Sequence, residues 1–161
     1  IRLINWHKFW DNTITLKNNT LFSGENGSGK TTILDAIFFV ISGGESRMFN
    51  KAANENSNRT VETYMRCKLG KENQECLRND SDLVSHIVLE FFDERKQSFK
   101  LIGTVLEIRG NGEPRSKFYS LDISLDKLCL IKNQRIQTAE ELKEMYGKDL
   151  FVEMNKSKKQ N

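Results

Sequence analysis

The sequence lacks a long apolar run. Its longest run, residues 36–41, has six residues, whereas a helix that spans a membrane needs about 20. With 37% apolar and 29% charged residues, we expect a soluble, cytoplasmic chain with no membrane partner, in which this run forms a buried helix. No secretory leader pattern opens the sequence, and it does not start with methionine. We therefore expect that it begins inside a reading frame or omits a disordered start.

Cysteine and net charge are also scarce. The three cysteines form no CxxC pair, so a disulfide framework or a zinc site is not expected. A net charge of +3 is too small to indicate nucleic-acid binding by itself. The length of 161 residues suits one domain, which we assign to residues 1–154. Residues 155–161 are interpreted as a solvated, lysine-rich tail.

Apolar alternation and turn residues predict a domain rich in antiparallel strands. Strands are predicted at residues 1–6, 13–17, 20–22, 84–92, 98–109, 117–123 and 150–154, with a turn at 110–112. A further short hairpin is predicted from residues 128–131 and 135–136. Residues 42–59 and 70–82 are predicted loops.

Few helices are predicted. Residues 29–41 show a helical pattern that Gly43 and Gly44 end. Thr138 and Glu141 form a capping box that opens a second helix, which Gly147 ends. The pattern over residues 60–69 fits either a short helix or a strand. The sequence thus predicts an α/β fold class.

A glycine-rich loop follows the predicted strand at 20–22 and opens the first helix. Residues 24–31, GENGSGKT, match the pattern G-x-x-x-x-G-K-[ST] in full. Glycines let the backbone wrap closely with its N–H groups inward, and the helix start adds positive potential. We expect Lys30 to bridge the β- and γ-phosphates of a nucleoside triphosphate, Thr31 to bind Mg²⁺ and Thr32 to meet the α-phosphate. The predicted binding residues are Glu25, Asn26, Gly27, Ser28, Gly29, Lys30, Thr31 and Thr32, with Lys30 also the predicted catalytic residue.

Three other segments imitate functional motifs. Asp93 and Glu94 follow an apolar segment, as the metal-holding acids of an ATPase do, but Glu90 interrupts it as in a half-exposed antiparallel strand. Residues 41–45, ISGGE, imitate an ABC-type signature, but we expect them to close a helix rather than open one. Residues 155–158, NKSK, begin like a guanine-reading motif but have lysine where its carboxylate belongs, which favours ATP.

These residues together resemble a known family. Residues 4–9 (INWHKF), 13–16 (TITL) and 20–37 (TLFSGENGSGKTTILDAI) are similar to the N-terminal head segment of SMC-like ATPases. Within that group, NRTV at 58–61, Tyr64, Arg66 and SHIVLEFFDE at 85–94 are most similar to the MukB-like ATPase subunit of bacterial Wadjet anti-plasmid systems (JetC or MksF type). The resemblance covers residues 1–108 well and the remainder loosely.

The resemblance implies a P-loop NTPase fold of the ABC/SMC head type, split by a coiled coil. This chain has no heptad run, so it would be the N-terminal lobe, with residues 155–161 leading toward a coiled coil that is absent. The implied partners are the C-terminal lobe of the same protein, a second head in a homodimer, a kleisin, small winged-helix subunits and double-stranded DNA. In a Wadjet system a separate nuclease subunit would cleave plasmid DNA. The implied ATPase would be inactive without the second lobe and partner head.

Alternatives and weaker candidates stay open at this point. The chain could be a head lobe of an SMC-like DNA-repair ATPase, a self-sufficient small P-loop NTPase that uses Asp93 and Glu94, or an inert nucleotide-binding module. His7 and Lys8 are either nucleotide contacts, as the resemblance implies, or an exposed strand end. Arg59 is either a contact to adenine or DNA or a surface arginine. Asp35 is expected to support the loop rather than bind metal.

Overall fold

One antiparallel sheet organises the chain in the computed structural model, which describes residues 1–45, 59–68 and 76–152. Its six strands lie in the order β2-β1-β3-β4-β5-β8, and each neighbouring pair is antiparallel. The strands are β1 (Arg2–Trp6), β2 (Phe9–Thr13), β3 (Leu83–Asp93), β4 (Ser98–Ile108), β5 (Arg115–Leu121) and β8 (Phe151–Val152). The remaining elements are α1 (Lys30–Ile41), α2 (Val61–Met65), the short 3-10 helix η2 (Leu125–Lys127), the hairpin β6 (Ile131–Lys132) and β7 (Arg135–Ile136), and α3 (Ala139–Tyr146).

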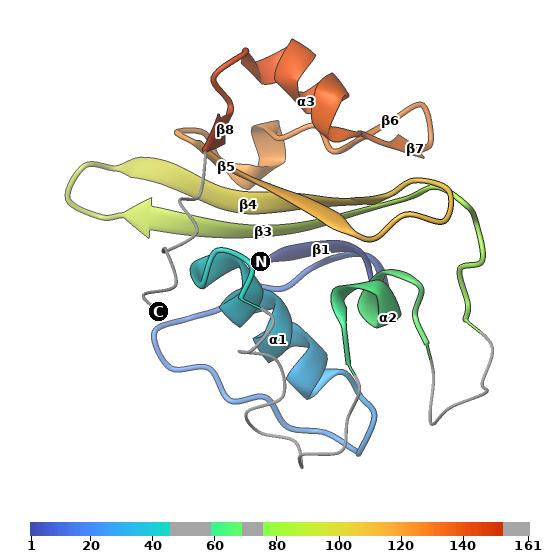
Figure 1. Ribbon diagram of the computed structural model, residues 1–161. Coiled ribbons are helices and arrows are strands. Elements are labelled where there is room, and N and C mark those ends of the chain that lie inside the picture. The colour runs from blue at the N-terminus through green and yellow to red at the C-terminus, as the bar shows by residue number, and fades with distance from the viewer. Residues whose placement is uncertain (46–58, 69–75, 153–161) are drawn as a thin grey trace, which may run out of the picture.

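The two faces of the sheet carry different layers. Helices α1 and α2 lie under one face, and α3 with the β6–β7 hairpin lies over the other (Figure 1). Alternation along β3 divides the core accordingly, because successive side chains of a strand point to opposite faces. Ile87 packs with Trp6 and Phe39 on the α1 side, whereas Val88 packs with Leu142 on the α3 side.

Most predicted elements are confirmed. The turn at 110–112 joins β4 to β5, the short hairpin forms as β6 and β7, and residues 61–65 are helical. Thr138 and Glu141 make the capping box of α3, and Gly147 is its C-cap residue. Residues 151 and 152 form β8 at the predicted last strand. The loop predicted at 42–59 has no helix or strand in its described residues, 42–45 and 59.

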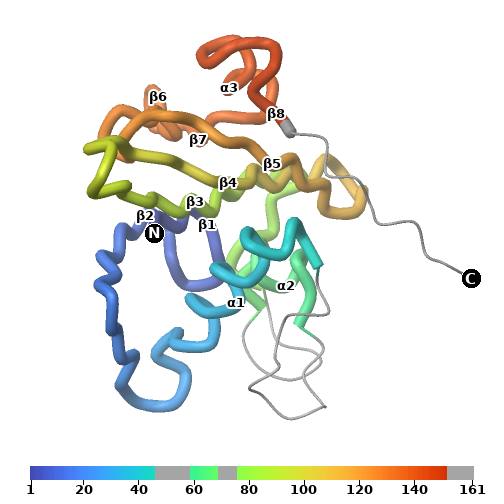
Figure 2. The backbone as a smooth tube through the Cα atoms, turned by 90° about the vertical axis from the view of Figure 1, so that its left-hand side faces the viewer, coloured from blue at the N-terminus to red at the C-terminus, as the bar shows by residue number. Residues whose placement is uncertain are grey.

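The strands predicted at residues 13–17 and 20–22, before the glycine-rich loop, are wrong. β2 ends at Thr13, and residues 14–29 contain no strand. A strand forms only where a neighbour accepts its backbone hydrogen bonds. Beyond the exchange between Ile14 and Ile1, residues 15–22 join no ladder, and Thr20 bonds locally to the backbone of Lys17. Figure 2 shows residues 14–29 as a long excursion away from the sheet.

Parts of several predictions lie outside the described residues. These are residues 46–58 and 70–75 of the two predicted loops, residue 69 at the end of the segment 60–69, the end of the last predicted strand, the NKSK segment and the basic tail at 155–161. Among the described residues, no helix is long and apolar enough to cross a membrane.

Candidate nucleotide-binding site

The glycine-rich loop ends in backbone geometry that suits glycine. Gly27 and Gly29 have φ values of 83° and 104°, a region that other residues rarely adopt. Gly29 also lies against Phe9 of β2, since a Cβ atom on Gly29 would lie 3.0 Å from the Phe9 Cζ atom. The position next to Lys30 therefore tolerates only glycine without strain.

Helix α1 begins directly after this glycine. Gly29 is its N-cap residue, and the first turn carries no acidic side chain. The N–H groups of a helix's first turn have no partner within the helix and carry the positive end of its dipole. The start of α1 therefore offers hydrogen-bond donors to an anion held by the loop.

Lys30 reaches back over the loop. Its Nζ donates to the carbonyl oxygens of Gly24 and Glu25 at 2.7 and 2.8 Å and to Ser28 Oγ at 3.4 Å. The Ser28 N–H donates to the Glu25 carbonyl at 3.2 Å, which closes a turn inside the loop. Since lysine carries three donor hydrogens and no acceptor, these contacts hold its charge at the mouth of the loop.

The threonines after Lys30 differ in access. Thr31 is half-buried, whereas Thr32 is only 5% exposed, and its carbonyl accepts the Trp6 Nε1–H at 3.1 Å. Among the described residues, no group of three or more His, Cys, Asp or Glu side chains could hold a metal ion. Mg²⁺ commonly binds through few protein ligands, substrate phosphates and water, and its binding by the Thr31 hydroxyl stays a prediction. The contact of Thr32 with the α-phosphate stays a prediction.

His7 and Lys8 form the turn between β1 and β2. Lys8 Nζ contacts the Gly27 carbonyl at 3.4 Å, so this lysine lies beside the loop. The His7 ring instead meets the Tyr64 ring edge-on, with centroids 5.8 Å apart, and the backbone N–H of His7 donates to the Tyr64 carbonyl. Burial lowers the pKa of His7, although a backbone hydrogen bond at Lys68 acts the other way. At this turn Lys8 therefore contacts the loop backbone, whereas the His7 ring packs against α2.

A buried network of polar side chains connects α1 to α2. The Tyr64 hydroxyl donates a hydrogen bond to Asp35, which is 3% exposed, and Arg59 Nη1 donates to the same hydroxyl at 3.4 Å. Arg59 Nη1 also lies 3.9 Å from the Asp35 carboxylate. Burial and the bond to Asp35 raise the pKa of Tyr64. Sequence analysis names Tyr64 only as part of the resemblance and does not predict its bond to Asp35, because no local pattern links residues 29 positions apart.

The other acidic candidates lie far from the loop. Asn5 donates to the Val84 carbonyl at the start of β3, beside Trp6, which bonds to α1. Asp93 lies nine positions after Val84 along β3, about 30 Å at ~3.4 Å per residue. Asp93 instead accepts backbone N–H groups within the charged turn of the β3–β4 hairpin. Figure 1 shows this hairpin end on the side opposite the start of α1.

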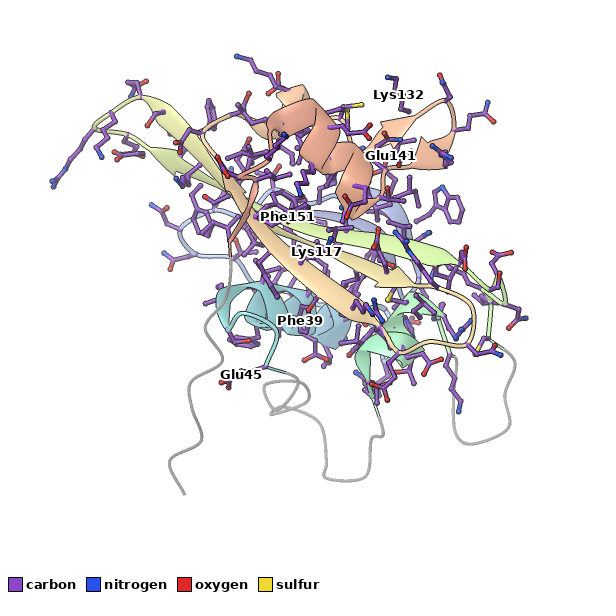
Figure 3. All side chains as sticks on the ribbon, turned by 45° about the horizontal axis from the view of Figure 1, so that its top comes forward. Phe39, Glu45, Lys117, Lys132, Glu141 and Phe151 are labelled. Carbon is purple, nitrogen blue, oxygen red and sulfur yellow. The ribbon has the colours of Figure 1, made fainter. Side chains whose placement is uncertain are left out.

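The imitation of an ABC signature closes α1, as predicted. Ser42 is the C-cap residue, and the Gly44 N–H donates to the Phe39 carbonyl at 2.8 Å. Gly44 also packs against Phe118 of β5. Figure 3 shows Phe39 on α1 beneath the sheet, with Glu45 beyond the helix end. The segment therefore ends the helix, and its packing against the sheet holds it in place.

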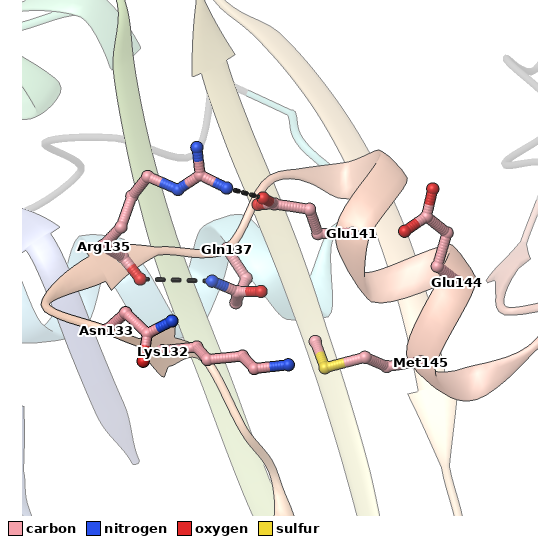
Figure 4. Close-up of a pocket in the computed structure, with 7 residues that line it drawn as sticks. All are labelled: Lys132, Asn133, Arg135, Gln137, Glu141, Glu144 and Met145. Atoms are coloured by element: carbon pink, nitrogen blue, oxygen red, sulfur yellow. Dashed lines mark hydrogen bonds and ion pairs between the residues drawn. The ribbon is translucent and has the colours of Figure 1, made fainter.

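A polar hollow on the other face of the sheet carries no comparable chemistry. It lies between the β6–β7 hairpin and α3 (Figure 4). Arg135 pairs there with Glu141, and Gln137 Nε2 donates to the Arg135 carbonyl at 3.2 Å. The hollow is lined by Lys132, Asn133, Arg135, Gln137, Glu141, Glu144 and Met145. Its charges have both signs, so we assign it no ligand.

Comparison with known proteins decides the character of the loop region. A sequence family described as "P-loop containing region of AAA domain" matches residues 1–56. The N-terminal region is of the P-loop NTPase type. The match includes the whole P-loop and α1, together with β1 and β2 that pack against them. No curated protein and no solved structure matches the chain.

Proposed function

We propose that this chain is the ATP-binding half of a composite, SMC-like ATPase head. The P-loop backbone and the start of α1 would bind the phosphates, and Lys30 would exchange its loop carbonyls for β- and γ-phosphate oxygens. Thr31 would bind Mg²⁺, which neutralises phosphate charge when bound. ATP and Mg²⁺ are the proposed cofactors.

The observation that carries the composite site is the unpaired segment before the P-loop. In this motif a strand leads into the loop. Here residues 20–22 have no strand partner among the described residues, and Leu21 is 89% exposed. A strand from a second lobe would supply the missing hydrogen bonds and cover Leu21.

Helix α1 supports the same proposal. Its face against the sheet is buried, but Phe38 and Ile41 on the other side are 43% and 65% exposed. A helix that is apolar all round is usually buried on all sides. The second lobe would therefore pack on this side of α1, and we propose that it is the C-terminal lobe of the same protein.

The position of Asp93 and Glu94 argues against a self-sufficient NTPase. A carboxylate that assists Mg²⁺ must lie within one water of it, whereas this pair ends a strand about 30 Å long that starts near α1. The acidic group that polarises water would come from the second lobe, and the signature that closes the site from a second head.

The cellular role is proposed from the family resemblance. ATP hydrolysis by paired heads would drive DNA translocation or loop extrusion, with a kleisin and small winged-helix subunits bound. The residues beyond the P-loop, SHIVLEFFDE among them, favour bacterial plasmid defence of the Wadjet type with a separate nuclease subunit. DNA repair by an SMC-like ATPase is the alternative role.

The test has two stages. Calorimetry of this chain with Mg-ATP should give binding that Lys30→Ala weakens at least tenfold and that Lys132→Ala, on the far face of the sheet, leaves unchanged. ATP hydrolysis should be negligible for the chain alone and should appear when the C-terminal lobe is added. Full hydrolysis by the chain alone would contradict the composite site. Binding without hydrolysis in the presence of the lobe would favour the inert module.

A further inference from the structure

Tyr64 joins three elements that surround the P-loop. Its hydroxyl donates to Asp35 of α1, and its ring stacks on Trp6 of β1 with centroids 4.4 Å apart. Its carbonyl accepts the His7 N–H at 2.8 Å from the β1–β2 turn. Helix α2, which carries Tyr64, begins with a capping box between Thr60 and Thr63. Tyr64 therefore lies on a helix whose N-terminus is fixed by its capping box.

The contacts reach α1 where it leaves the loop. Asp35 lies four residues after Thr31, so the two share one face of the helix. Trp6, held by the Tyr64 ring, donates to the carbonyl of Thr32 in the first turn. One hydrogen bond made by Tyr64 and one made by the Trp6 on which it stacks thus connect the first two turns of α1 to α2 and β1. A buried hydrogen bond to a carboxylate is stronger than one between neutral groups, and it is costly to break.

We propose that Tyr64 is a positioning residue for the nucleotide. Through Asp35 and Trp6 it holds the start of α1, and hence Lys30 and Thr31, in the geometry that binds triphosphate. The proposal rests on the proposed nucleotide-binding function and deepens it. Arg59 completes the arrangement by placing a positive charge 3.9 Å from the Asp35 carboxylate.

Tyrosine-to-phenylalanine exchange offers a matched pair of variants. Tyr64→Phe keeps the ring on Trp6 but removes the hydroxyl's bonds to Asp35 and Arg59. Tyr119→Phe is the control, because Tyr119 is equally buried on the other face of the sheet and its hydroxyl has no hydrogen-bond partner among the described residues. We expect Tyr64→Phe to weaken Mg-ATP binding about tenfold, measured by calorimetry below the unfolding temperature of every variant. Tyr119→Phe should bind as the parent chain does.

Trp6 gives a spectroscopic readout of the same contact. The chain has two tryptophans, and Trp10 is exposed, so a Trp10→Phe background isolates the emission of Trp6. We expect Mg-ATP to change this emission, and Tyr64→Phe to reduce the change at saturating nucleotide. A residue that only stabilised the fold would leave the saturated change intact in the folded variant.

The outcomes separate this inference from the proposed function. If the parent chain binds no Mg-ATP, the proposed function fails and this inference with it. If the parent binds but Tyr64→Phe binds equally well with the same Trp6 response, the inference alone is overturned. Should Tyr64→Phe not fold, Asp35→Asn and Asp35→Ala decide, because asparagine keeps an acceptor for the tyrosine. Asp35→Ala should then lose affinity more than Asp35→Asn, and equal affinities would overturn the inference.

Discussion

At the scale of single residues, the contacts of Lys30 show how the P-loop is stabilised in the free chain. Its ammonium donates to two loop carbonyls and one hydroxyl. Phosphate oxygens can replace these acceptors one for one, so the lysine can exchange partners without becoming unpaired. The loop and its principal cation thus stabilise each other in the free chain.

Gly29 combines two constraints that can be separated by mutation. We predict that Gly29→Ala lowers the free energy of unfolding by about 2 kcal/mol, from a φ of 104° and the approach to Phe9, and also weakens Mg-ATP binding. Gly110→Ala is the control, because Gly110 also has a positive φ, 56°, but no atom within 4 Å of its added Cβ. Urea denaturation should show a smaller loss for the control, with nucleotide binding unchanged. Equal losses would mean that the contact with Phe9 is unimportant.

His86 predicts a pH dependence of stability. It is fully buried, its Nε2 lies 2.7 Å from the Gln137 carbonyl, and burial lowers its pKa to about 4. Between pH 4 and about 6.5 the unfolded chain binds a proton at this histidine that the folded chain does not. Stability should therefore fall as pH drops through this range, by about 3 kcal/mol for His86 alone, and level off below pH 4.

The measurement is urea denaturation at several pH values, with His86→Gln for comparison. His7, the chain's other histidine, has a pKa lowered in the same direction, so a smaller slope should remain in the variant. An unchanged slope in His86→Gln would contradict the prediction.

At the scale of elements, what the sequence predicts depends on whether the signal is local. Alternation and the glycine-rich turn predict β3, β4 and β5, and the Thr138–Glu141 spacing predicts the start of α3. These elements find their partners next to them in sequence. Residues 20–22 have equally apolar character but form no strand, because strand formation also needs a partner.

The residues of the candidate site also differ in whether a local signal predicts them. The predicted P-loop residues follow from spacing, because the motif lies within eight consecutive residues of the chain. Tyr64 and the orientation of His7 depend on packing between β1, α1 and α2, which sequence spacing does not encode. Asp93 and Glu94 resemble a metal-holding pair in sequence, but the length of β3 places them far from the P-loop.

At the scale of the whole molecule, the layers on the two faces of the sheet differ in how fully their apolar side chains are buried. On the α3 side, Leu142, Leu130 and Tyr119 enclose a fully buried core. On the α1 side, the helix buries one apolar face and leaves the other open, next to the excursion of residues 14–29 shown in Figure 2. This asymmetry indicates that the α1 side is the one a further lobe would cover.

The exposed side of α1 yields a prediction that separates stability from assembly. Phe38→Ser with Ile41→Ser should lower the unfolding free energy of the chain less than the same change at a buried position, because the two residues are 43% and 65% exposed. The same pair should prevent assembly with the C-terminal lobe, measured by size-exclusion chromatography with light scattering, since each buried side chain of this size contributes about 1.5–3 kcal/mol to the interface.

The control uses the β3–β4 hairpin, where Phe91 and Phe92 are each 47% exposed. Phe91→Ser with Phe92→Ser removes comparable apolar surface at the end of the sheet away from the P-loop. If α1 is the covered face, only the α1 pair abolishes assembly and the ATP hydrolysis that depends on it. Loss of assembly in the hairpin pair alone would move the interface to the hairpin. The P-loop would then have to acquire its missing strand and acidic group by a different arrangement of lobes.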